Sequence, residues 1–224
     1  QRLGIIKSLQ RQGFSLDEIK HLLTQCPLSD LIVMMDEKRA ALREQIAQQN
    51  AVYERMTSAT DLLRDCTRLR MQPRLCAGSA AYLIDFDSVS ALWAAVPKMP
   101  LLKDLIDALP LTNYCTTIPL ALLSGQSAAT RVGIVAPVEF THVIHADFSQ
   151  MRMCAGPQTV KTIFELRPPE DSSMQPVIDL TREFLQAHRL TPVCEGYTRQ
   201  YAWFVDGDGQ MRHYSELIVP VMAE

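Results

Sequence analysis

A carboxylate among aromatic side chains near the C-terminus is the part of this sequence best suited to chemistry. Tyr201 and Trp203 are two residues apart in one predicted strand, and Tyr214, Glu216 and Ile218 alternate in the next. Since alternate residues of a strand lie on one face, we expect each set to share a face. A carboxylate buried among apolar neighbours is costly unless a partner offsets its charge. A lipophilic cation would be such a partner, through its charge and through stacking on the aromatic rings.

Two simpler interpretations of Glu216 stay open. It could be exposed on the surface, or it could pair with Arg199 or Arg212. Further aromatic and methionine side chains could line the rest of a ligand pocket, because Met adapts to varied ligand shapes. They are Tyr82, Trp93, Met99, Phe164 and Met174. For each of these, ordinary core packing is the simpler explanation.

Catalysis has little support in the sequence. It contains no G-x-S-x-G, no H-E-x-x-H, no Walker loop and no Gly-rich dinucleotide fingerprint. The six cysteines are scattered without a C-x-x-C pair, which predicts reduced thiols rather than a disulfide frame or a zinc site. We therefore expect no catalytic residue, no metal and no cofactor. The enzyme alternative would use Glu216 or Glu165 as a general base.

Composition bounds the class of protein. The 224 residues are 47% hydrophobic and 21% charged, which is ordinary for a globular chain with a sizeable core. No apolar run is long enough to span a membrane and no signal pattern opens the chain, so we expect a cytoplasmic protein without a membrane partner. The acidic excess lies from Pro73 onward, so this larger part is not expected to bind nucleic acid by itself.

A long helix is predicted over Ser29–Arg70, without an internal Gly or Pro. Its apolar residues recur at alternating steps of four and three, which is a heptad seam. Polar residues such as Lys38 and Gln45 also fall on the seam and could set the register. We expect this helix to pair with the same helix of a second chain; the alternative is a connecting helix that lies on its own domain. The apolar residues predicted to mediate dimerisation are Leu31, Met35, Leu42, Val52, Met56 and Leu63.

Two short helices are predicted before it. An amphipathic helix stops at Gly13, and the capping box Ser15–Glu18 begins the second helix, which Cys26-Pro27 ends. The run Gly13–Lys20, set between Leu9 and the long heptad helix, resembles the final helical pair of the MerR family's DNA-binding domain. In that family a winged helix-turn-helix precedes this pair. It is not in this sequence, so we expect a truncated chain whose promoter-contacting part is absent; an ordinary capped hairpin is the alternative.

From about Arg74 the pattern becomes mixed and repeats. The predicted strands are Leu75–Phe86, two between Tyr114 and Val138, Phe140–Phe148, Val160–Leu166, and a hairpin over Tyr197–Val221. Helices are predicted over Ser88–Leu109, with a break near Pro97 and Pro100, and over Ser172–His188. A strand-helix-strand-strand unit that occurs twice predicts an α+β domain with antiparallel pairing.

The closing strands of the two units align by eye, Arg131–Val138 over Tyr214–Val221. This duplicated unit, which ends in Glu-Leu-Ile-Val-Pro-Val, resembles the GyrI-like effector-binding domain that follows the dimerisation helix in the multidrug-sensing branch of the MerR family. The resemblance implies a ligand role for Glu216, whose counterpart is Gly133. It also favours a role for Trp203 and, less directly, for Tyr201 and Trp93.

Together the resemblances imply a homodimeric, drug-responsive transcriptional activator. Residues 1–28 would be the end of a MerR-type DNA-binding domain, 29–72 an antiparallel coiled-coil dimerisation helix, and 73–224 the GyrI-like domain. In this family a lipophilic, often cationic drug binds the C-terminal domain, and distortion of promoter DNA lets RNA polymerase engage. The alternatives are a GyrI-like sequestering protein and a small-molecule hydrolase, neither with a transcriptional role.

Overall fold

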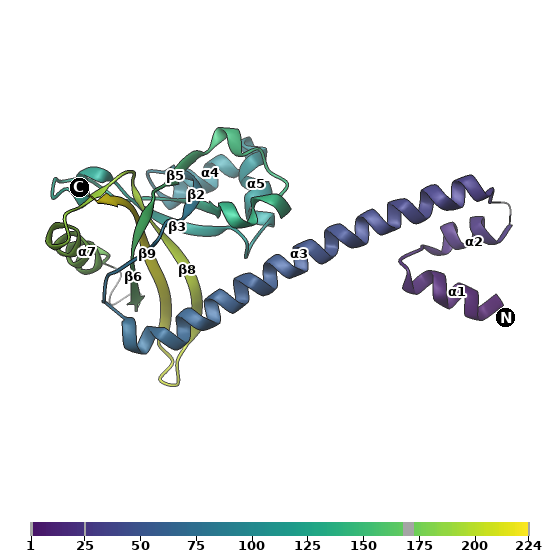
Figure 1. The fold of residues 1–224 in the computed structure, drawn as a ribbon, viewed down its shortest axis with the longest axis horizontal. Helices are drawn as coiled ribbons and strands as arrows, with labels where there is room; N and C mark the ends of the chain where they lie inside the picture. The colour runs from purple at the N-terminus through teal and green to yellow at the C-terminus, as the bar shows by residue number, and fades with distance from the viewer. Residues whose placement is uncertain (1, 25, 168–172, 224) are drawn as a thin grey trace. The chain divides into compact units, whose positions relative to one another are not determined.

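The computed structural model describes residues 2–24, 26–167 and 173–223 (Figure 1). The chain forms two compact units, Gln1–Ala51 and Val52–Glu224, each of which is described by itself. Among the described residues, none of the helices combines the length and the apolar content needed to cross a membrane.

The first unit contains α1 (Arg2–Arg11), α2 (Leu16–Thr24) and the first part of α3 (Leu28–Leu69). Gly13 ends the first helix with a φ of +86°, a left-handed conformation that glycine adopts without strain. The predicted capping box is confirmed. The Ser15 amide donates to Glu18 Oε2 at 2.6 Å, and the Glu18 amide donates to Ser15 Oγ at 3.3 Å.

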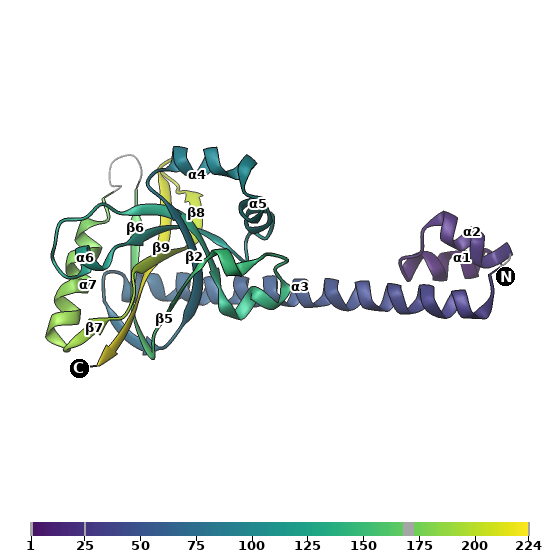
Figure 2. The same cartoon turned by 90° about the horizontal axis from the view of Figure 1, so that it is seen from above.

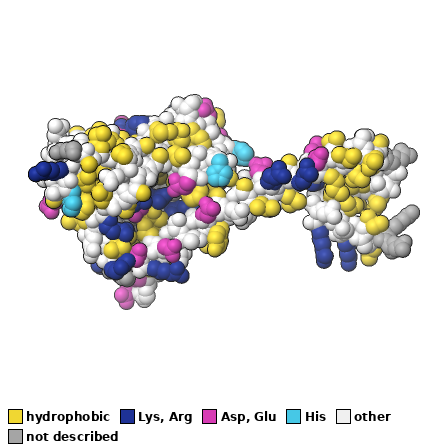
Figure 3. All heavy atoms as spheres, viewed as in Figure 1, with side chains coloured by type: hydrophobic (Ala, Val, Ile, Leu, Met, Phe, Trp, Pro, Cys, Tyr) yellow, Lys and Arg dark blue, Asp and Glu magenta, His cyan; other side chains and the backbone are white. Residues whose placement is uncertain are grey.

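The long helix α3 spans 42 residues, one position earlier at each end than predicted. Within the first unit its apolar seam is largely uncovered, with Met35 38% and Leu42 45% exposed. Apolar side chains are visible on the surface of this unit in Figure 3. Lys38, a polar seam position, instead binds within the unit, with Nζ 2.9 Å from Glu18 Oε1 and 5.4 Å from the centre of the Phe14 ring.

The part of α3 in the second unit packs against its own domain. Arg55 and Cys66 are buried, and after the helix the Met71 amide donates to Ile163 O at 2.7 Å. The connecting-helix interpretation therefore holds for this segment. Of the predicted dimerisation residues here, Val52 and Leu63 are half-buried and Met56 is exposed. Dimerisation itself stays a prediction.

The described part of the second unit contains one nine-stranded antiparallel sheet, with the order β1-β6-β9-β8-β3-β4-β2-β5 and β7 paired with β9 (Figures 1 and 2). The strands are β1 (Arg74–Ala77), β2 (Ala80–Phe86), β3 (Asn113–Ile118), β4 (Arg131–Pro137), β5 (Arg152–Ala155), β6 (Gln158–Leu166), β7 (Leu190–Pro192), β8 (Gly196–Val205) and β9 (Met211–Ala223).

The predicted α+β class and its internal repeat are confirmed. The first repeat is β2, the helices α4 (Val89–Ala95) and α5 (Pro100–Asp107), then β3 and β4. The second is β6, α7 (Gln175–Ala187), β8 and β9. The expected break between α4 and α5 is the 3-10 turn η1 (Val96–Lys98). A short helix α6 (Leu120–Leu123) follows β3.

The helices of both repeats cover one face of the sheet. Tyr114 and Ile118 share a face of β3, since four residues separate them; Tyr114 packs in the cluster of α4 and α5, and Ile118 in the cluster of α7. Leu102 and Leu105 on α5 are fully buried, and each stabilises the fold by roughly 1.5–3 kcal/mol. The opposite face carries its own apolar cluster, which includes Tyr197 and Ile218.

The predicted strand over Phe140–Phe148 is wrong. The chain there forms the 3-10 segments η2 (Val138–Val143) and η3 (Phe148–Gln150). Phe140, Val143 and Ile144 are buried, and their spacing of three and four is that of a helical turn, which the apolar content alone did not distinguish from a strand. The predicted strand Leu75–Phe86 is in fact two strands, β1 and β2. Ser172, the predicted start of α7, lies outside the described residues.

Candidate functional site

The site begins with a β-bulge in the hairpin of β8 and β9. Arg199 pairs with Glu216, but the register shifts between Gln200 and Ala202, so that Trp203 pairs with His213. Directly paired residues point to the same side of a sheet, and Glu216 and His213 point to opposite sides. The prediction that Tyr201 and Trp203 share a face is therefore wrong, because the extra residue in the bulge reverses the alternation.

Glu216 lies on the face of the sheet opposite α7 and is only 3% exposed. Tyr201 Oη donates a hydrogen bond to Glu216 Oε2 at 3.1 Å, and Lys161 Nζ lies 4.0 Å from the same oxygen. Arg199 Nε in turn donates to Tyr201 Oη at 2.9 Å. The surface interpretation of this carboxylate is thus wrong. The proposed pairing with Arg199 is indirect, through the tyrosine hydroxyl.

Tyr201 stands between a carboxylate and two guanidinium groups. Arg55 Cζ lies 4.6 Å and Arg199 Cζ 5.5 Å from the centre of its ring, within range of cation–π attraction. Burial, together with the charge of Glu216, raises the pKa of the Tyr201 hydroxyl. Burial alone would lower the pKa of Arg199, but Tyr201, Glu216 and Glu139 outweigh it and leave that pKa raised.

Arg55 is the site residue that the sequence did not reveal. It projects from α3 and donates through Nη2 to Asn113 Oδ1 at 2.9 Å and to Gln200 O at 2.6 Å, while Nε donates to Pro110 O at 3.4 Å. It thereby joins β3 and β8, which pair with each other only at Thr117–Tyr197 and Ile118–Gly196. An arginine beside a heptad seam gives no signal of its own, since such positions are usually solvated.

The two tryptophans lie apart from Glu216. Trp203 stacks on His213 with ring centres 4.1 Å apart, and Trp93 lies 6.1 Å from Tyr114. Both are about half exposed, at 52% and 50%, and both line a cavity of about 380 Å³. Trp203 also lines a second cavity, of about 270 Å³, together with Arg55 and Tyr201. Trp203 therefore lines both cavities, one together with Trp93 and the other together with Arg55 and Tyr201.

The other predicted ligand residues are placed less favourably. Phe164 is buried beneath α7, on the face opposite Glu216. Tyr82 and Met99 pack in the cluster of α4 and α5, where Tyr82 lies 5.0 Å from Phe148. Tyr214 stacks near Phe204, with ring centres 5.9 Å apart. Core packing accounts for Phe164 and Tyr82, and the ligand role of all four residues stays a prediction.

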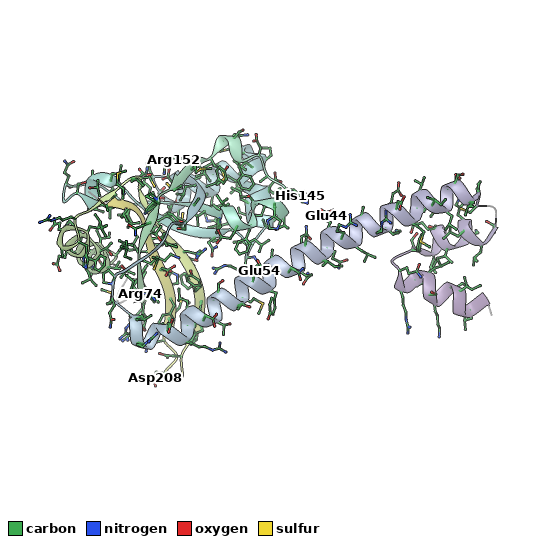
Figure 4. All side chains as sticks on the ribbon, viewed as in Figure 1. Glu44, Glu54, Arg74, His145, Arg152 and Asp208 are labelled. Atoms are coloured by element: carbon green, nitrogen blue, oxygen red, sulfur yellow. The ribbon has the colours of Figure 1, made fainter. Side chains whose placement is uncertain are left out.

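A second charged cluster is neutralised internally. Arg152, labelled in Figure 4, and Arg131 both bind Asp85, at 3.0 and 3.2 Å, and both bind Glu195. Arg212 pairs with Asp206 and Glu165 rather than with Glu216. Over the described part of the chain, His, Cys, Asp and Glu do not gather into a group of three that could hold a metal ion. The Glu216–Tyr201 region is therefore the best candidate site.

Residues 1–59 match a family model described as MerR, DNA binding. None of the curated proteins compared matches the chain. Among solved structures, the EcmrR–DNA complex in EcmrR-RPo has a TM-score of 0.38 at 15% identity, over 99% of this chain and 82% of that one. The EcmrR C-terminal domain gives 0.40 at 12% identity, over 68% and 96%. SAV2435 bound to tetraphenylphosphonium gives 0.35 at 12% identity, over 67% and 93%.

These structural similarities are too weak to carry an argument about function. The family match confirms the predicted MerR resemblance of the N-terminal segment and supports a MerR-type transcriptional regulator, a class that acts by binding DNA rather than by catalysis.

Proposed function

We propose that the chain is part of a BmrR-like multidrug regulator, a homodimeric MerR-type activator whose C-terminal domain binds lipophilic cations at Glu216. The observation that carries the proposal is that buried Glu216 accepts a hydrogen bond from a tyrosine whose ring already attracts two cationic groups of the protein. A ring and a carboxylate that stabilise guanidinium groups also suit a delocalised organic cation.

Two cationic side chains of the protein, Arg55 and Arg199, already lie at the Tyr201 ring. A drug cation at the Tyr201 ring competes with Arg55 and Arg199 for the same attraction, so its net gain comes from apolar contact and from Glu216. Release of Arg55 would free the junction that it makes between α3, β3 and β8. A ligand that favours the released state would shift the equilibrium towards it, and α3 would sense the change.

The remaining parts of the proposal follow the order of the chain. Residues 1–28 complete a DNA-binding domain, 29–72 pair two chains in an antiparallel coiled coil, and 73–224 bind the effector. Exposed seam residues such as Met35 and Leu42 support the pairing, since apolar surface of this kind is typical of an interface. Promoter DNA would be held mainly by the segment that precedes residue 1 in the family, and RNA polymerase would engage the distorted promoter.

Isothermal titration with tetraphenylphosphonium tests the ligand proposal. We expect one site per chain, and an affinity at least tenfold weaker in Glu216→Gln, a loss of about 1.4 kcal/mol. Glu183→Gln, on the exposed face of α7, is the matched control and should bind like the wild type. Equal binding by wild type and Glu216→Gln would remove this carboxylate from the site. Absence of binding to tetraphenylphosphonium and to other lipophilic cations, in folded protein, would overturn the multidrug proposal.

A further inference from the structure

Two residues that line the cavity of about 270 Å³ each carry a buried hydrogen-bond donor without a partner. The cavity lies where β3 and β8 diverge, and its lining includes Arg55 and Asn113 together with the apolar residues Met56, Leu109 and Pro110. Arg55 and Asn113 are only 5% and 6% exposed. Among the described residues, neither Arg55 Nη1 nor Asn113 Nδ2 has a hydrogen-bond partner.

Such a pair of donors calls for an explanation. A buried polar group left unpaired is destabilising, the more so if it is charged, and native structures contain few of them. Both groups are also fixed in orientation. Arg55 is held by Pro110 O and Gln200 O, and Asn113 Oδ1 accepts from Arg55 Nη2, which leaves Nδ2 to donate elsewhere.

The local charge favours an anion at this position. Arg55 and Arg199 share the ring of Tyr201, and Lys161 lies 4.0 Å from Glu216. The carboxylates near these three cations are Glu216 and Glu139, which is 3.2 Å from Arg199, so the group carries one excess positive charge. Burial, and then repulsion from Arg199, lowers the pKa of Arg55. The negative charge of a bound anion would counteract both effects.

We infer that this cavity binds an apolar molecule by a carboxylate group, which accepts hydrogen bonds from Arg55 Nη1 and Asn113 Nδ2. The apolar body of the molecule packs against Met56, Leu109 and Pro110. Charge-assisted hydrogen bonds of a carboxylate to guanidinium are stronger than those between neutral groups. The site shares Arg55 with the Tyr201 ring, so an anion bound here would hold Arg55 in place, whereas a cation at the ring would compete with it.

The test is isothermal titration with 2-naphthoate and its neutral analogue 2-naphthamide. We expect one naphthoate per chain and at least tenfold weaker binding of the amide. Arg55→Lys keeps the charge but removes Nη1, and should weaken naphthoate binding tenfold or more. Asn113→Asp keeps the acceptor for Arg55 and replaces the Nδ2 donor by a carboxylate oxygen that repels the ligand's carboxylate, so it should also weaken naphthoate binding tenfold or more. Arg64→Lys, an exposed position of α3, is the matched control.

Other outcomes separate this inference from the proposed function. Glu216→Gln should bind naphthoate at least as well as the wild type, since it removes a negative charge, whereas it should lose tetraphenylphosphonium. If Arg55→Lys does not fold, Asn113→Asp decides, because the introduced carboxylate pairs with Arg55 and the melting temperature should not fall. The inference is overturned if the wild type does not bind naphthoate, if it binds naphthamide equally well, or if Asn113→Asp leaves binding unchanged.

Discussion

The two repeats of the C-terminal unit have the same order of elements but differ at the centre of their closing strands. Gly133 on β4 and Glu216 on β9 occupy equivalent positions in the alignment of the repeats. At Gly133 the neighbouring strand approaches so closely that an added Cβ would lie 2.1 Å from Ile84 O. At Glu216 the neighbouring strand contains a bulge, and a buried carboxylate is held by Tyr201. The first repeat is closed by backbone contact, and the second keeps room for side-chain chemistry.

This difference has a general lesson about duplicated folds. A duplicated unit preserves strand order and helix cover because these depend on the apolar pattern. The site, by contrast, arises where the copies diverge: one inserted residue at Tyr201 places Arg199 and Trp203, which would share a face in a regular strand, on opposite faces. The separation of β3 from β8, where the repeats meet, then admits Arg55 from α3.

The largest effect on stability is expected from a substitution at Gly133 in the first repeat. Gly133→Ala places a methyl group against the Ile84 carbonyl of the paired strand, which cannot move without disrupting β2. We expect a loss of about 3 kcal/mol or more in the free energy of unfolding, measured by urea denaturation. Gly207→Ala, in the β8–β9 turn with no atom within 4 Å of the new Cβ, should cost less than about 0.5 kcal/mol. Equal costs at the two positions would contradict the close approach.

A pH effect is expected in the second repeat. Burial lowers the pKa of His213 from 6.5 to about 4. The unfolded chain therefore binds the proton more readily, so stability is full above pH 6.5 and falls as the pH is lowered towards 4. When the pH is lowered from 7.5 to 5, the free energy of unfolding should fall by about 2 kcal/mol.

His213→Gln, which can still hydrogen-bond Ser215 Oγ, should flatten this part of the stability profile. His142→Gln, an exposed position in η2, is the matched control. Urea denaturation at several pH values provides the measurement. If the profile of His213→Gln falls as steeply as that of the wild type, the acid sensitivity comes from other groups.

A smaller effect distinguishes how the two repeats hold their helices. In the first repeat α5 packs on an apolar cluster and its Leu105 carbonyl accepts a hydrogen bond from Thr112 Oγ1, whereas in the second repeat two buried side chains, Thr162 Oγ1 of β6 and Thr181 Oγ1 of α7, bond to each other at 3.0 Å. Thr181→Val leaves the Thr162 hydroxyl unpaired, at a cost of about 1–2 kcal/mol. The double variant Thr162→Val/Thr181→Val should be more stable than this single variant, as measured by thermal unfolding. Additive losses would show that the hydroxyls act separately.

Local sequence patterns predicted much of the fold. The capping box at Ser15 and Glu18, the extent of α3 and the α+β repeat depend on neighbouring residues or on simple periodicity, and these are confirmed. The site was less predictable. That Glu216 lies near Tyr201 could be predicted from the residue types on two neighbouring strands. The bulge that places Trp203 away from them depends on the register of those strands. Arg55 enters from a helix more than a hundred residues away in sequence from β8, and no local pattern marks such a contact.

Amide hydrogen exchange with and without saturating tetraphenylphosphonium tests the central claim most directly, because it compares the repeats in one experiment. We expect slower exchange around Tyr201 on β8 and from Ser215 to Ile218 on β9, with little change at the equivalent amides of β3 and β4. Protection centred on Gly133 and its β3 neighbours, or spread equally over both repeats, would contradict the assignment of the effector site to the second repeat.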